Sequence, residues 1–138
     1  MTKTIDEMID DSVSPEFVRA YLECALWSST IDDEDGNLGT PYDSIYAIDD
    51  FSNETVAHAI VDCNNFIQAN REDLDEVSDT YHVDYSQHGH DFWLTRNGHG
   101  AGFWDRGYGE VGDRLSKASK VYGSTYLYIN DHNQICVD

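Results

Sequence analysis

The sequence predicts an α+β fold in the order α-α-β-β-α-β-β: two acidic N-terminal helices, then a small, mainly antiparallel sheet with one further helix. Apolar residues recur at helical spacing in the first 80 residues, a glycine-rich turn separates two aromatic runs, and apolar residues alternate near the C-terminus. The 138 residues suit one domain, with an acidic half over 1–80 and an aromatic, glycine-rich half over 81–138.

Both N-terminal helices begin at residues that cap helices well. Ser14 followed by Pro15 predicts a helix that runs to about Ser28. Ser52 caps the second helix, which continues or restarts through 71–77. Its apolar stripe consists of Val56, Ala59, Ile60, Cys63 and Ile67. The composition of 32–44 predicts a loop, and 45–48 is a short strand or a turn.

The second half is expected to hold two pairs of strands around a helix. Asn97-Gly98 predicts a hairpin turn between strands at 92–94 and 103–104. A helix over 111–122 ends at Gly123, and strands at 126–129 and 135–137 follow. We expect the large rings to be buried and to hold the domain together, with two arginines paired to neighbouring acids. These residues are Phe92, Trp93, Phe103, Trp104, Arg96 and Arg106.

Charge is distributed very unevenly along the chain. Of 27 acidic and eight basic residues, 20 acids but only three bases lie in 1–80, which carries −17 of the net charge of −19. Acids four positions apart, such as Glu72 and Glu76, repel one another on a helix, and no lysine between Lys3 and Lys117 relieves them. The pattern favours an anionic binding face over three alternatives, which are general solubility, adaptation to high salt and a calcium-binding loop at 32–37. The loop lacks the glycine and glutamate spacing that a calcium loop needs.

The spacing of these acids indicates a class of partner. Carboxylates one helical turn apart lie about 5–6 Å from each other, similar to successive phosphates of a DNA strand. We therefore expect a non-enzymatic DNA mimic, without cofactor, that binds the basic surface of a nucleic-acid-binding protein. Direct binding to nucleic acid or to an anionic membrane is disfavoured by repulsion. The candidate binding residues are Glu72, Asp73, Asp75, Glu76, Asp79, Asp32, Asp33, Glu34, Asp35, Asp49, Asp50, Glu16 and Glu23.

Two other function classes remain open on the sequence. His88, His90, Asp91 and His99 offer the side chains of a metal-binding module or a small metal-dependent enzyme, because i, i+2 histidines share one side of a strand. A homo-oligomeric phage structural or assembly protein is the other alternative, and a homodimer is compatible with the inhibitor.

The run DFWLTRNGHGAGFWDR, residues 91–106, resembles a motif of small, largely uncharacterised bacteriophage and plasmid proteins. The resemblance implies a mobile element inside a bacterial cell and implies no catalytic residues. By charge alone, the chain is similar to phage DNA mimics that block restriction or CRISPR proteins.

The remaining sequence features agree with a bacterial cytoplasmic location. Cys24, Cys63 and Cys136 are odd in number and widely spaced, so we expect buried free thiols in a reducing compartment. The polar N-terminus does not read as a secretory signal, and no apolar run approaches the length of a transmembrane helix.

Overall fold

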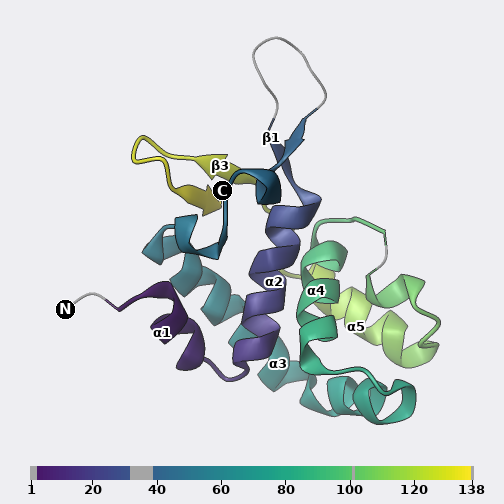
Figure 1. Cartoon of the computed structure of the whole chain (residues 1–138). Helices are drawn as coiled ribbons and strands as arrows, with labels where there is room; N and C mark the ends of the chain where they lie inside the picture. Colours follow the sequence, from purple (N-terminus) through teal and green to yellow (C-terminus); the bar gives the residue numbers. More distant parts are fainter. Residues whose placement is uncertain (1–2, 32–38, 101, 138) are drawn as a thin grey trace.

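The computed structural model describes residues 3–31, 39–100 and 102–137 and has the predicted α+β class (Figure 1). Its α-helices are α1 (Ile5–Asp10), α2 (Pro15–Ser28), α3 (Asn53–Tyr81), α4 (Tyr85–Arg96) and α5 (Glu110–Lys120). Its strands are β1 (Thr30–Ile31), β2 (Thr40–Pro41), β3 (Leu127–Ile129) and β4 (Ile135–Val137), and its 3-10 helices are η1 (Tyr42–Ser44), η2 (Ile48–Asp50) and η3 (Phe103–Asp105). In place of one sheet, the described residues form two separate antiparallel pairs, β1-β2 and β3-β4.

The two predicted N-terminal helices, α2 and α3, are confirmed with their caps. Ser14 accepts a hydrogen bond from the backbone N–H of Phe17, and Ser52 accepts one from Thr55. The short helix α1 precedes them and was not predicted; Thr4 and Glu7 form its capping box. Helix α3 runs for 29 residues and has non-helical dihedral angles at Asn70. The sequence predicted that this helix either continues or restarts through 71–77, and the structure shows one helix with a kink directly before that segment.

The strands predicted at 92–94 and 103–104 are wrong, because the first lies in α4 and the second in η3. Asp84 accepts a hydrogen bond from the Gln87 backbone N–H and starts α4 as its N-cap. Residues on several sides of α4 are buried, so the continuous apolar run reflects a buried helix, which short apolar runs do not distinguish from a strand.

Asn97-Gly98, predicted as a hairpin turn, instead ends helix α4. Gly98 has φ +72°, and its N–H donates to the Thr95 carbonyl at 3.1 Å while the His99 N–H donates to the Leu94 carbonyl at 2.8 Å. These two bonds are the pattern of a Schellman cap, which requires a left-handed residue just as a hairpin turn does. The sequence signal for a left-handed residue at Gly98 was therefore correct, but it was assigned to a hairpin turn in place of a helix end.

The C-terminal elements agree with the sequence. Helix α5 begins one residue before the predicted range of 111–122 and ends two residues before its end, and Gly123 follows with φ +76°. Strands β3 and β4 pair with Ile129 opposite Ile135. Strand β4 also reaches the start of α3, where the Ser52 N–H donates to the Ile135 carbonyl at 2.9 Å.

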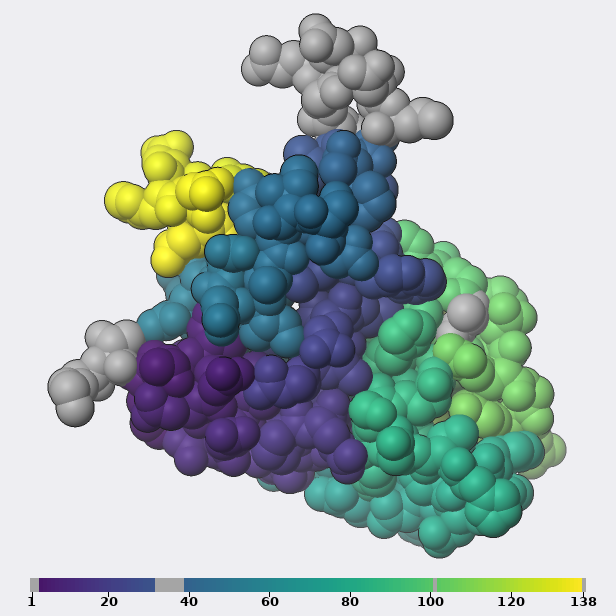
Figure 2. Space-filling view, in the orientation of Figure 1, coloured from purple at the N-terminus to yellow at the C-terminus, as the bar shows by residue number. Residues whose placement is uncertain are grey.

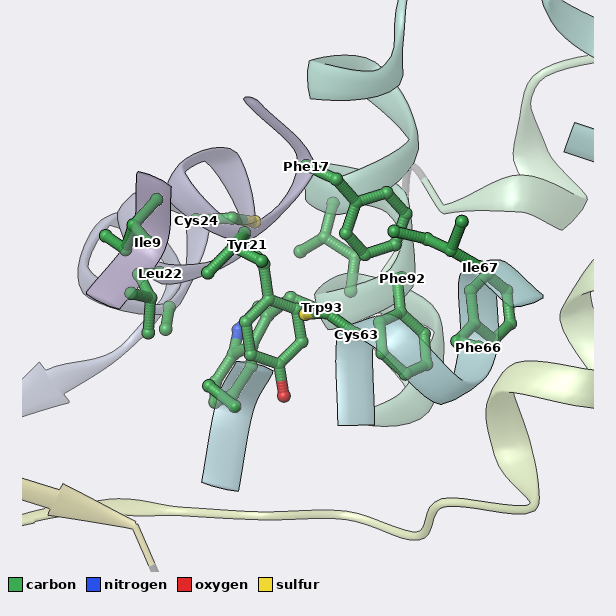
Figure 3. Close-up of a cluster of buried hydrophobic side chains, with 14 of the residues drawn as sticks. Ile9, Phe17, Tyr21, Leu22, Cys24, Cys63, Phe66, Ile67, Phe92 and Trp93 are labelled. Atoms are coloured by element: carbon green, nitrogen blue, oxygen red, sulfur yellow. The ribbon is translucent and has the colours of Figure 1, made fainter. Parts of the chain in front are cut away.

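Both halves of the chain contribute to the core, so the aromatic half is not a separate scaffold. Helices α2 and α4 pack side by side, and the rings of Phe17, Phe66 and Phe92 meet between them and α3 (Figure 3). The Phe66 and Phe92 rings stack with centroids 4.2 Å apart. Phe103 is buried as predicted, but Trp104 is 52% exposed, which corrects its assignment to the core.

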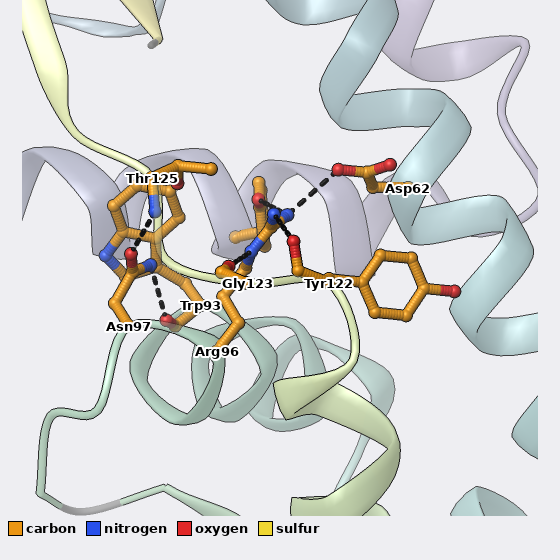
Figure 4. Close-up of polar contacts among 8 residues, drawn as sticks. Asp62, Trp93, Arg96, Asn97, Tyr122, Gly123 and Thr125 are labelled. Atoms are coloured by element: carbon orange, nitrogen blue, oxygen red, sulfur yellow. Dashed lines mark hydrogen bonds and ion pairs between the residues drawn. The ribbon is translucent and has the colours of Figure 1, made fainter.

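Arg96 is a buried side chain that forms four hydrogen bonds to other described residues. Its guanidinium donates to the carbonyls of Gly123 and Tyr122, to the Tyr21 hydroxyl and to Asp62, each at 2.9 to 3.0 Å (Figure 4). This confirms the predicted arginine–acid pairing and joins α4 to α2, α3 and the segment after α5. Arg106 pairs with Asp91 in the same way, at 2.9 Å.

Candidate partner-binding surface

The first group of predicted acids lies on the C-terminal half of α3, at the bottom of Figure 1. The side chains of Glu72, Asp75, Glu76 and Asp79 are exposed, whereas Asp73 is half-buried. The positions 72, 76 and 79 follow the i, i+4, i+7 pattern, so these three acids share one face of the helix.

An arginine of another helix relieves part of this negative charge, which the sequence alone did not predict. Arg114 of α5 binds both carboxylate oxygens of Asp73, at 3.0 and 3.1 Å, and approaches Glu76 at 3.9 Å. The Tyr85 hydroxyl donates to Asp75 at 2.5 Å and accepts from Arg71 at 3.1 Å. Within the described residues, Glu72 and Asp79 have no ion pair, so the anionic strip is narrower than the sequence suggests.

A second acidic surface is an open groove of about 550 Å³ where α1 and α2 meet η1 and η2. We call it the Trp27 groove. It is lined by Asp6, Arg19, Glu23, Leu26, Trp27, Asp43, Tyr46, Ala47, Ile48 and Asp49. Figure 2 shows these elements on one face of the molecule, with η1 and η2 above α1 and α2.

The groove combines negative charge with an exposed aromatic ring. Arg19 is the one basic side chain among the described residues that line the groove, and it forms an ion pair with Asp6 at 3.0 Å. Glu23, Asp43 and Asp49 are exposed and have no ion pair within the described part of the chain. Trp27 is 58% exposed, which is unusual for a tryptophan in a domain whose core is rich in aromatic residues.

Trp27 also borders a neighbouring groove that continues toward α4. This second groove shares Glu23 with the first and adds Ser86, Gln87 and His90. The His90 ring lies 5.7 Å from the Trp27 ring, centroid to centroid. The indole therefore borders two surface grooves.

The other predicted acids lie apart from these surfaces or have structural contacts. Glu16 is exposed at the start of α2, beside a shallow groove that also contains Arg71. Asp50 accepts a hydrogen bond from the Ala47 N–H at 2.8 Å and holds η2. Asp32, Asp33, Glu34 and Asp35 lie outside the described residues.

Of the residues of the metal-binding alternative, His90 and Asp91 approach each other, with Nδ1 3.7 Å from Oδ1, but the four described side chains do not form one cluster. On a helix, His88 and His90 point in different directions: His88 is buried with Nε2 3.1 Å from the Leu74 carbonyl, whereas His90 faces Trp27. Burial lowers the pKa of His88, although the Leu74 carbonyl and nearby acids act in the opposite direction. Asp91 forms an ion pair with Arg106, and His99 is exposed in the segment that follows α4. The described residues contain no group of three His, Cys, Asp or Glu side chains placed to hold a metal ion.

The three cysteines are buried and unpaired, as the sequence predicts. Burial raises the pKa of the Cys24 thiol to about 12, with nearby Asp91 adding to the effect. A thiol of this kind is a poor nucleophile.

Sequence reasoning identified Glu23 and Asp49 but missed Asp6, Asp43 and Trp27 as members of the same groove. Trp27 falls near the end of an amphipathic helix, where its position gave no signal of exposure. Asp43 of η1, Asp49 of η2 and Asp6 of α1 line the same groove as Trp27 only because these elements pack against α2.

No family model, curated protein or solved structure matches this chain. None of the helices over 3–31, 39–100 and 102–137 is long and apolar enough to cross a membrane.

Proposed function

We propose that this chain is a DNA-mimic inhibitor encoded by a mobile element, which binds the DNA-binding surface of a bacterial defence or DNA-processing protein. The observation that supports it best is the Trp27 groove, where three carboxylates without ion pairs among the described residues line the same groove as an exposed indole. The anti-restriction or anti-CRISPR role is the specific form of this proposal.

The chemistry of the groove selects a cationic protein surface. Glu23, Asp43 and Asp49 supply acceptors for arginine or lysine, and a guanidinium can also stack on the face of Trp27. Tryptophan and arginine are frequent energetic centres of protein interfaces, particularly where neighbouring contacts exclude water. Dense arginine and lysine surfaces are typical of proteins that bind nucleic acid, because they neutralise phosphates.

The strip on α3 extends the same proposal to a second contact. Glu72, Glu76 and Asp79 are spaced by one helical turn, about 5–6 Å, which suits a row of phosphate-binding cations. A partner engaged at either acidic surface loses access to DNA by occupancy, so inhibition requires no catalytic residue in this chain.

The proposal is tested by capture from a bacterial lysate with immobilised protein, with and without excess duplex DNA. The test variant combines Glu23→Gln, Asp43→Asn and Asp49→Asn. The control variant combines Glu110→Gln, Asp113→Asn and Asp131→Asn, which removes equal charge from exposed positions away from the groove.

We expect DNA to displace a defined set of proteins from the unmodified chain and from the control variant. The same proteins should be reduced at least about tenfold on the groove variant, corresponding to about 1.4 kcal/mol. Equal capture by the groove and control variants would contradict the proposal, as would captured proteins that DNA fails to displace.

A further inference from the structure

A separate cavity of about 260 Å³ lies between α2, the start of α3, α4 and the C-terminal strands. We call it the Arg96 cavity. It shares no lining residue with the Trp27 groove. Tyr21, Phe51 and Trp93 are among its lining residues, and Glu54 and Tyr128 also line it at exposed positions. Its walls come from five elements, so the cavity is a product of the whole fold.

The polar groups of the cavity include one that the protein leaves without a partner. Thr125 Oγ1 is buried and has no hydrogen-bond partner among the described residues, whereas the Thr125 backbone N–H donates to Asn97 Oδ1 at 2.8 Å. Buried hydroxyl groups are normally hydrogen-bonded, so an orphaned one in a cavity wall indicates a place for a polar atom of a ligand or a water molecule. Figure 4 shows Thr125 and Trp93 on one side of Arg96, with Asp62 on the other.

The charges of the cavity indicate the charge of its ligand. Arg96 and Asp62 neutralise each other at 2.9 Å. Glu54 also lines the cavity and has no ion pair among the described residues, so the lining retains one uncompensated carboxylate. His58 also lines the cavity, at an exposed position. An anionic ligand would meet this carboxylate in a strongly acidic protein, whereas a cation would be attracted to it.

We propose that the Arg96 cavity binds a small aromatic amine, with its planar ring among Tyr21, Phe51 and Trp93 and its ammonium group directed to Glu54. Aromatic rings favour both ring stacking and a nearby cation. A volume of about 260 Å³ suits a ligand with one or two fused rings, slightly below the usual size of drug-binding pockets. This site is independent of the partner-binding proposal, since its residues and ligand differ.

The test is a charge series on one ring, measured by calorimetry with the full chain: tryptamine, indole-3-ethanol and indole-3-acetate. The three probes share the indole and differ in the charge of the side chain. We expect tryptamine to bind at least about tenfold more tightly than the neutral alcohol, and the acid to bind most weakly. The proposal is overturned if the alcohol or the acid binds as tightly as tryptamine, or if none of the three binds.

A matched pair of variants assigns the selectivity to Glu54. Glu54→Gln should remove the preference for tryptamine over the alcohol while leaving binding of the alcohol unchanged. Glu110→Gln removes the same charge from an exposed position of α5, outside the cavity, and should leave both affinities unchanged. Equal effects of the two variants would show that the overall negative charge attracts the amine, and would overturn the assignment of the cavity.

Discussion

Gly89 lies where α4 packs directly against the backbone of α2 at Phe17. Replacing Gly89 with alanine therefore tests the packing of the two helices. A Cβ atom added at Gly89 would lie 2.0 Å from the Phe17 carbonyl oxygen and 2.8 Å from its carbonyl carbon. Both are backbone atoms, so no side-chain rotation relieves the contact. Ordinary contacts begin at 3.4 Å, which means that the helices must separate by about 1.4 Å.

The cost of this separation is estimated from two opposing effects. Overpacking a core costs about 1–3 kcal/mol, and a backbone clash belongs at the upper end of that range. Alanine regains about 1 kcal/mol over glycine through its helix propensity. We therefore expect Gly89→Ala to reduce the free energy of unfolding by about 2 kcal/mol, and the melting temperature by about 6–8 °C.

The measurement is urea unfolding followed by circular dichroism, with Gly100→Ala as the matched control. A Cβ atom at Gly100 meets nothing within 4 Å, and its φ is not in the left-handed region. We expect the control to change stability by less than about 0.5 kcal/mol. If Gly89→Ala is as stable as the original protein, the close packing of α2 on α4 is refuted.

Three further predictions concern buried polar groups. Burial lowers the pKa of His88 below 6.5, so just below this pH the unfolded chain binds a proton at His88 that the folded chain does not bind. The contribution of neutral His88 to the free energy of unfolding is therefore complete above pH 6.5 and decreases as the pH falls below it. His88→Gln should lessen the loss of stability between about pH 7.5 and about pH 5.5 in urea unfolding, and an unchanged loss would contradict this. Arg96→Met leaves two carbonyls and Asp62 without their donor. It should lower the free energy of unfolding by about 3 kcal/mol, at the low end for a broken buried pair because Asp62 is 36% exposed. Arg114→Met, at an exposed pair, should have a much smaller effect in the same urea unfolding experiment, and similar effects of both variants would contradict the role of Arg96. Cys24, with a pKa of about 12, should be alkylated by iodoacetamide at least about a hundredfold faster in urea than in the folded protein, as followed by mass spectrometry; equal rates would show that the thiol is not buried.

Local signals predicted several elements because their physical cause is local. Ser14-Pro15 and Ser52 begin α2 and α3, and the final strands pair as expected. Helix α4 was missed because its apolar run is buried on several sides and Gly89, a poor helix former, is required by contact with Phe17. That contact joins positions far apart in sequence, so no local pattern contains it.

The candidate surfaces were less predictable than the fold. Sequence spacing correctly placed Glu72 and Glu76 on one helical face, but Arg114 of α5 pairs with Asp73 and approaches Glu76. Trp27 became a candidate only through its exposure and the packing of η1 and η2 around it. Pairing between distant elements decides which acids remain uncompensated, and a linear charge pattern carries no information about it.

The end of α3 has a consequence for the speed of association. Its last turn contains no basic residue, although the C-terminus of a helix carries about half a negative charge from its aligned peptide dipoles. The dipole therefore adds to Glu76 and Asp79 where most helices place a lysine or an arginine. At physiological salt this field extends only about 8 Å, so it accelerates the final approach of a cationic molecule more than it lengthens the lifetime of the complex.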